Sequence, residues 1–290
     1  MNYARVIIIG AARSGTNMLR DVLTSIPKVG TWPCDEINYI WRHGNARCVH
    51  DEFTPDMATE SIVRYIRLRF DRLARSQRLG YVVEKTCANS LRVGFVNAVV
   101  PDARFVFLLR DGRDVVASAM RRWTAPLDIR YVARKARFVP TADLPYYGLR
   151  YAANRMHKLA SQEKRLAGWG PRYAGMVEAA NHLCLSQVCA RQWARSVEKA
   201  EEELARIPSD RVVRVRYEEF VAKPEDELLR VADSLGLRLS ATDAARYTSD
   251  VNPGSVGAWR TKLGEEDQAF MIEEAGSVLE KHGYPVGGKE

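Results

Sequence analysis

The first residues of the chain combine a buried-strand pattern, a loop bounded by glycines and a helical pattern. A strand is expected over Arg5–Ile9, Gly10 and Gly15 enclose four residues, and a helix is expected over about 16–25. Glycines let the backbone turn tightly, so that its N–H groups and the N-terminus of the following helix face an anion. The G-x-x-x-x-G spacing is that of a P-loop, and it predicts a phosphate site between a strand and a helix.

The loop departs from the type that binds a nucleoside triphosphate with magnesium. Thr16 and Asn17 stand where that type has lysine and a hydroxyl residue. Arg13 and Ser14 lie inside the loop, and Arg13 supplies the cation instead. These residues predict binding of a phosphate group without a metal ion.

Apolar runs and helical patterns alternate along the rest of the chain. This alternation predicts an α/β fold: a P-loop-type parallel sheet flanked by helices, with helical insertions. Because no linker divides the sequence, one domain is expected over 1–290, with 123–180 as a helical insertion and a possible acceptor-binding region. Further strands are expected at 81–83, 103–109 and 211–216, and helices at 114–122, from 224, at 143–166, 178–206 and 265–282.

The charge of the chain indicates an anionic partner. Lysine and arginine number 44 against 36 acidic residues, which gives a net charge of +8. The arginines are spread along the sequence without interleaved aromatics, so a small anionic nucleotide is favoured over nucleic acid. The longest stretch without a charge, Ala179–Ala190, is far shorter than a membrane span.

The chain is expected to be cytoplasmic. Its N-terminal apolar run, Val6–Ile9, is too short for a secretory signal. The five cysteines are an odd number without a C-x-x-C pair, and they predict free thiols. The sequence does not indicate an oligomeric state.

A second phosphate site is predicted after the strand at 103–109. Arg110 follows the end of this strand, and Ser118 lies in the next helix. Together an arginine and a hydroxyl can hold a phosphate through charge-assisted hydrogen bonds.

These two segments together closely resemble the sulfotransferases that use 3′-phosphoadenosine-5′-phosphosulfate (PAPS), in particular the glycan and tyrosylprotein branch. The resemblance implies that the first loop binds the 5′-phosphosulfate and the second site the 3′-phosphate. Glu84-Lys85-Thr86 resembles the E-K-[ST] of glycan sulfotransferases. Two more segments imply donor-binding residues: 215–220, with Tyr217 beside the nucleotide, and 254–260, which closes over it with Ser255, Gly257, Trp259 and Arg260.

Sulfuryl transfer needs a base for the acceptor hydroxyl and a cation on the transferred group. Glu36 is the candidate base, because it lies 23 residues after Arg13 and the related glycan and tyrosylprotein enzymes carry their glutamate at a similar distance. Lys85 is the candidate acid and electrostatic stabiliser. Asp35, Glu84 and a histidine remain alternative bases, the histidines being His43, His50, His157 and His182.

The expected function is transfer of the sulfuryl group of PAPS to a hydroxyl of a carbohydrate or glycan. The alternatives are a tyrosine or small-molecule phenol or alcohol as acceptor, a P-loop kinase of a small molecule, and a non-catalytic protein that binds a nucleotide or nucleic acid. Several aromatic residues are candidates for an acceptor cleft, although most are expected in the core: Trp32, Tyr39, Trp41, Phe53, Trp123, Tyr146, Tyr147, Trp169 and Tyr173.

Overall fold

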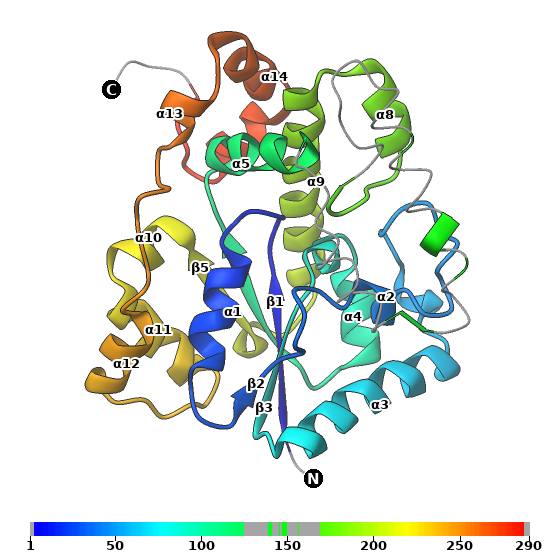
Figure 1. Ribbon diagram of the computed structural model, residues 1–290, viewed down its shortest axis with the longest axis vertical. Helices are drawn as coiled ribbons and strands as arrows, with labels where there is room; N and C mark the ends of the chain where they lie inside the picture. Colours follow the sequence, from blue (N-terminus) through cyan, green and yellow to red (C-terminus); the bar gives the residue numbers. More distant parts are fainter. Residues whose placement is uncertain are drawn as a thin grey trace.

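The computed structural model describes residues 3–124 and 169–286, together with positions 139–140, 145, 147–149 and 156 between them. Within these ranges, helical segments separate the successive strands, and only helices follow the last strand (Figure 1). The strands are β1 (Ala4–Ile9), β2 (Val29–Gly30), β3 (Tyr81–Lys85), β4 (Arg104–Leu109) and β5 (Val212–Arg216). The helices are α1 (Thr16–Thr24), α2 (Asn38–Trp41), α3 (Glu60–Gln77), α4 (Val93–Val99), α5 (Gly112–Thr124), α8 (Met176–His182), α9 (Leu185–Leu204), α10 (Tyr217–Ala222), α11 (Pro224–Ser234), α12 (Ala241–Thr248), α13 (Trp259–Lys262) and α14 (Glu265–Lys281), with short 3-10 turns at Pro55–Met57, Cys87–Leu91 and Ser209–Arg211.

The five strands form one parallel sheet in the order β2-β3-β1-β4-β5. This arrangement confirms the predicted fold class. Because every strand runs in the same direction, the carboxyl ends of β3, β1, β4 and β5 lie side by side at one edge. Ligands of open α/β sheets bind outside this edge. The segments that follow these four strands are therefore the first place to look for a site.

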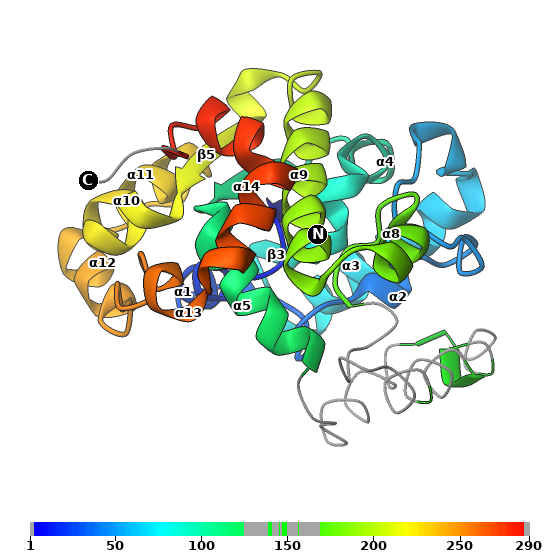
Figure 2. The ribbon, with the colours of Figure 1, turned by 90° about the horizontal axis from the view of Figure 1, so that it is seen from above.

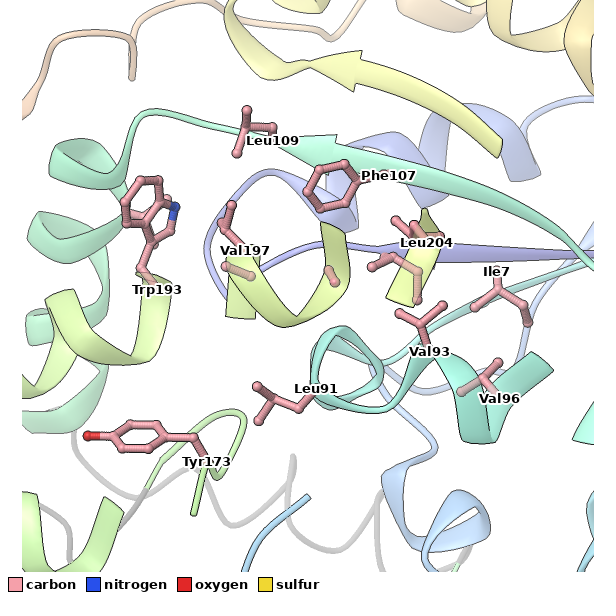
Figure 3. Packing of buried hydrophobic residues seen from close by; sticks show 14 of the residues in the cluster. Ile7, Leu91, Val93, Val96, Phe107, Leu109, Tyr173, Trp193, Val197 and Leu204 are labelled. Carbon is pink, nitrogen blue, oxygen red and sulfur yellow. The ribbon is translucent and has the colours of Figure 1, made fainter. Parts of the chain in front are cut away.

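Helices cover both faces of the sheet. One face packs against α1, α10, α11 and α12, and the other against α3, α4, α5, α9 and α14 (Figures 1 and 2). Alternate residues of β1 point to opposite faces, so that Ile8 belongs to the first core and Ile7 to the second. In the second core, Val197 and Leu204 of α9 lie near Phe107 of β4 (Figure 3). The sheet is thereby buried on both sides, as parallel sheets require.

The structure differs from the sequence predictions in several places. Strand β2 and helix α3 were not expected. The pattern at 178–206 is not one helix, because the backbone is extended at Leu183 and Cys184 and a new helix starts there, with the Gln187 side chain accepting a bond from the Cys184 amide. The helix expected at 143–166, and most of the insertion expected at 123–180, lie outside the described residues. No described helix is long and apolar enough to cross a bilayer.

Candidate active site

The candidate residues come from four neighbouring strand ends. Lys85 closes β3, the loop from Gly10 follows β1, Arg110 follows β4 and Tyr217 follows β5. The parallel order β3-β1-β4-β5 brings these four together at one edge of the sheet, although they are far apart in the sequence.

The two glycines of the loop are required by close packing. A Cβ at Gly10 would lie 2.8 Å from the carbonyl oxygen of Leu108 and 2.9 Å from Cγ2 of Thr16. Gly15 has φ of 91°, and a Cβ there would lie 2.4 Å from the ring of Tyr217. Gly15 is also the N-cap of α1 and provides no side-chain cap, so the first N–H groups of the helix are left for another acceptor. The loop is thus shaped to receive an anion at a helix N-terminus.

The polar side chains of the loop are oriented around the same space. Arg13 adopts a left-handed conformation with φ of 75°, and its Nε donates to Oγ of Ser118 at 2.9 Å. Among the residues that the structure describes, Oγ of Ser14 and Oδ1 of Asn17 are buried and find no hydrogen-bond partner. Thr16 is buried, and its hydroxyl lies 3.6 Å from Sγ of Cys87. Buried polar atoms are normally hydrogen-bonded, so the orphan atoms of Ser14 and Asn17 fit a missing ligand.

The electrostatics of Arg13 also favour an anion. Burial, followed by the nearby positive charges of Arg122, Arg121 and Arg110, lowers the pKa of Arg13 below its ordinary value. A bound anion would stabilise the charged form of Arg13 and reverse this shift.

The second predicted phosphate site is continuous with the first. Nη1 of Arg110 donates to the carbonyl oxygen of Arg13 at 3.3 Å. The Arg110 guanidinium lies over the Tyr217 ring, 4.1 Å from its centroid, and Nη2 donates to the carbonyl oxygen of Ser255 at 2.7 Å. The Tyr217 hydroxyl and Oγ of Ser255 are 2.7 Å apart. Arg13, Ser118 and Arg110 therefore form one connected cluster rather than two separate sites.

The C-terminal segment is fastened to the same helix by Asp114, a residue to which the sequence analysis gave no role. Its carboxylate accepts the amides of Gly257 and Trp259, both at 2.9 Å, and lies 3.6 Å from Nη2 of Arg110. The Trp259 ring contacts the guanidinium groups of Arg113 and Arg260, at 4.3 and 4.9 Å from its centroid. Ser255 thus reaches Arg110 and Tyr217, whereas the exposed Arg260 side chain lies over the Trp259 ring.

The candidate base and the candidate acid lie together beside the loop. Nζ of Lys85 is 3.1 Å from Oε1 of Glu36 and 3.5 Å from Oδ1 of Asp35. The amide of Cys87 donates to the same oxygen of Glu36 at 3.4 Å. Nη1 of Arg20 donates to the carboxylate and to the backbone carbonyl oxygen of Asp35. Since Cys87 also lies against Thr16, this carboxylate–lysine pair is adjacent to the first turn of α1.

Burial and charge hold Lys85 in its protonated form. The Lys85 side chain is only 2% exposed, and burial alone would lower its pKa. The carboxylates of Glu36 and Asp35 outweigh this effect and raise the pKa of Lys85 above its ordinary value. Lys85 is therefore a fixed positive charge that can donate hydrogen bonds.

The other proposed bases are placed differently. Glu84 is 1% exposed and binds Thr86 and Asn89 in the interior, so it is neither a second carboxylate of the open site nor an ion-pair partner of Lys85. Burial raises the pKa of Glu84 to about 7. The His43 ring stacks on Tyr65 with centroids 3.8 Å apart, and His182 ends α8. His157 lies outside the described residues.

Most of the aromatic candidates for an acceptor cleft are core residues. Tyr39 is half-buried and contacts Tyr147 at 4.6 Å between ring centroids, close in sequence to Glu36. Tyr146 lies outside the described residues. Within the described ranges, no group of three or more histidine, cysteine or acidic residues could hold a metal ion. The aromatic candidates that are buried in the core are Trp32, Trp41, Phe53, Trp123 and Tyr173, and Trp169 packs against the same core.

Comparison with known proteins assigns the family. The family model described as the sulfotransferase family matches residues 5–166 and 152–241. The chain belongs to the sulfotransferase family. A comparison of this sulfotransferase with curated proteins finds no match.

Solved structures share the fold of this sulfotransferase. The sulfotransferase domain from the curacin biosynthetic pathway is 13% identical with a TM-score of 0.56, over 98% of this chain and 99% of that one. Sulfotransferase STF9 from Mycobacterium avium is 15% identical with a TM-score of 0.55, over 100% and 79% of the two chains. A sulfotransferase from Alicyclobacillus acidocaldarius is 16% identical with a TM-score of 0.51, over 97% and 96%.

Proposed function

We propose that this sulfotransferase transfers the sulfuryl group of PAPS to an acceptor hydroxyl. The observation that carries the proposal is the contact between the two anion sites: Nε of Arg13 reaches Ser118, and Arg110 reaches the backbone of Arg13. A donor with phosphate groups at both ends of one nucleoside matches one connected cluster that contains two arginines. The orphan polar atoms of Ser14 and Asn17 fit the same donor.

The donor-binding roles follow from these positions. The loop residues Gly10, Arg13, Ser14, Gly15, Thr16 and Asn17 hold the 5′-phosphosulfate, and Arg110 and Ser118 hold the 3′-phosphate. Tyr217, stacked with Arg110, lies beside the nucleotide. The segment with Ser255, Gly257, Trp259 and Arg260 covers the donor. No metal is needed, because arginine and lysine supply the positive charge.

The chemistry needs one proton acceptor and one cation at the transferred group. Glu36 takes the proton of the acceptor hydroxyl while that oxygen forms a bond to sulfur. The bond from sulfur to the phosphate oxygen breaks in line with it, and the electron pair leaves with 3′,5′-adenosine bisphosphate. Lys85 and Arg13 stabilise the charge on the sulfuryl group and on the leaving oxygen. The 3.1 Å contact between Glu36 and Lys85 supports roles at one reacting group.

For the acceptor we propose a carbohydrate or glycan hydroxyl, as in the glycan branch that the E-K-T segment resembles. The base and the lysine match that branch, whereas Arg13 matches the tyrosylprotein branch. A phenol or small alcohol is the alternative. The curacin-pathway relative shares the fold at 13% identity and does not decide the acceptor. The expected cytoplasmic location favours a glycan precursor or a secondary metabolite over a secreted protein.

Ligand-dependent stability tests the donor. We expect 3′,5′-adenosine bisphosphate to raise the melting temperature of the protein, because a ligand that binds only the folded state stabilises it. At 100 times its Kd the gain is about 2.7 kcal/mol. ATP with magnesium is the control and is expected to have no comparable effect. A larger shift with ATP and magnesium would support the kinase alternative, and DNA binding that weakens steeply with salt would support a nucleic-acid-binding protein.

Replacing Arg13 by alanine is expected to weaken donor binding and to slow turnover together. The variant loses the guanidinium that joins the loop to Ser118. Charge-assisted hydrogen bonds contribute about 1.5–3 kcal/mol, which is roughly 10- to 150-fold in Kd. Calorimetry with the bisphosphate measures the affinity, and unchanged binding would remove Arg13 from the site. Arg64→Ala, on the exposed face of α3, is the matched control.

A further inference from the structure

A buried carboxylate behind the site is connected to the residue that follows the candidate base. Glu84 lies on β3 directly before Lys85, and it is 1% exposed. Its Oε1 accepts the hydroxyl of Thr86 at 2.6 Å, and Oγ1 of Thr86 accepts the amide of Ile37 at 3.3 Å. This first chain of hydrogen bonds ends on the backbone next to Glu36.

A second chain starts at the other oxygen of Glu84 and ends one residue further along. Oε2 accepts from Nδ2 of Asn89 at 2.9 Å, and Oδ1 of Asn89 accepts from Nε of Arg92 at 2.9 Å. Nη2 of Arg92 then donates to Oδ1 of Asn38 at 2.5 Å. Asn38 is the first residue of α2, so both chains end on the segment that carries Glu36.

The directions of these hydrogen bonds are fixed when Glu84 is ionised. Thr86 is completely buried and has one hydroxyl proton, which it donates to Glu84. Its lone pairs are thereby turned toward the amide of Ile37. Buried polar groups are costly when unpaired, so a network of this kind permits few alternative arrangements. The position of the backbone amide after Glu36 is thus restricted, through Thr86, by the Glu84 carboxylate on β3.

The same strand therefore acts on both members of the carboxylate–lysine pair. Successive residues of a strand point to opposite faces, so Lys85 turns toward Glu36 while Glu84 turns into the core. Burying the Glu84 carboxylate costs desolvation free energy. An apolar side chain would fill the same space without that cost, so the carboxylate is expected to have a role beyond packing.

We propose that Glu84 and Thr86 are positioning residues that hold the Glu36 carboxylate against Lys85 for proton transfer. This inference rests on the proposed function, in which Glu36 is the base. Neither residue touches the donor or the acceptor. Their contribution is to restrict the segment 36–38, since displacement of a catalytic group by about 1 Å can cost about 10²-fold in rate.

The test compares Thr86→Val with Thr86→Ser. Valine keeps the shape but removes the hydroxyl, whereas serine keeps the hydroxyl. We expect Thr86→Val to lower kcat about 10- to 100-fold with the Kd of 3′,5′-adenosine bisphosphate unchanged. Thr86→Ser is expected to retain most of the activity. Equal loss of kcat in the two variants would overturn the proposal, as would an unchanged kcat in Thr86→Val.

A second measurement separates positioning from general damage. Thr86→Val is combined with Glu36→Gln, and we expect the valine to cost nothing further when the base is already absent. A merely structural role would lower kcat equally in both backgrounds. Asn38→Ala removes the end of the second chain at a half-buried position and is expected to behave in the same way, so the test survives if Thr86→Val does not fold.

The proposed function can fail separately from this inference. Absence of bisphosphate binding, or normal turnover in Glu36→Gln alone, would refute the donor or the base before the valine variant is considered. A crystal structure of Thr86→Val provides a readout without turnover. We expect the separation of Glu36 Oε1 and Lys85 Nζ to increase from 3.1 Å, and an unchanged separation would contradict the positioning role.

Discussion

Replacing Glu36 by glutamine is expected to lower kcat by about 10²–10⁴-fold, the usual contribution of a general base. This range corresponds to about 3–5 kcal/mol of activation free energy. The amide keeps the size of the side chain but cannot take the proton of an acceptor hydroxyl. Glu36 contacts Lys85 and the Cys87 amide, and its proposed role is at the acceptor hydroxyl, so binding of the bisphosphate is expected to persist.

Asp35→Asn is the matched control, because Asp35 also lies near Lys85 but is bound by Arg20. We expect it to reduce turnover much less than Glu36→Gln. Turnover is measured with labelled donor over a panel of glycans, phenols and lipids. Near-normal turnover in Glu36→Gln, with a large loss in Asp35→Asn, would transfer the role of base to Asp35.

Asp51→Asn is expected to destabilise the fold by about 3–5 kcal/mol, the cost of breaking a buried ion pair. Asp51 is 1% exposed and lies between Arg42 and Arg92, which are also buried. Its second oxygen accepts the amide of Arg172 at 2.9 Å. Without the carboxylate, two buried guanidinium groups lose their negative partner. The midpoint of urea unfolding measures the loss, with the slope m unchanged.

The control for this variant is Glu60→Gln, which removes an exposed ion pair with Arg64 on the surface of α3. Exposed pairs contribute about 0–1 kcal/mol, so little change is expected. A loss no larger in Asp51→Asn than in Glu60→Gln would contradict the argument from burial.

The destabilisation by Asp51→Asn should depend on pH. Burial acts to raise the pKa of Asp51, but the charges of Arg92 and Arg42 outweigh it and hold that pKa below its ordinary value. A lowered pKa stabilises the fold above about pH 4, and this contribution is lost as the pH falls through the folded-state pKa. The difference between wild type and variant should therefore shrink below pH 4. A constant difference from pH 7 to pH 3 would exclude this origin.

The sequence predicted the strands with the strongest apolar patterns. β1 and β4 are long, wholly apolar at their centres and buried, so their patterns are unambiguous. Strand β2 has two residues and leaves no periodic signal. Helix α3 buries Ile62, Ile66 and Phe70 at helical spacing, but the arginines between them conceal the stripe. The break before α9 depends on a cysteine N-cap, which is not among the preferred capping residues.

For the site, loop spacing located the residues that follow each strand, because those positions depend on local backbone geometry. The partners contributed by distant segments were not predictable in this way. Asp114 lies between Arg110 and Ser118 in the sequence, but its bonds to the amides of Gly257 and Trp259 arise only when the C-terminal segment folds back. Thr86 and Asn89 likewise could not be assigned a role from the sequence, because their hydrogen bonds lead to the distant segment that carries Glu36. Thr86 accepts the amide of Ile37, and Asn89 is linked to Asn38 through Arg92. The roles assigned to all these residues stay predictions until the variants are measured.

The contact of Arg110 with Ser255 spans 145 positions of the chain. During synthesis the amino-terminal part emerges first and begins to fold before later segments are available. The glycine loop and its sheet neighbours can then form while the Ser255 segment is still inside the ribosome. A nascent chain arrested before that segment emerges should therefore bind adenosine bisphosphate weakly. Full affinity should appear only once residues 254–260, which bind Asp114, have left the exit tunnel.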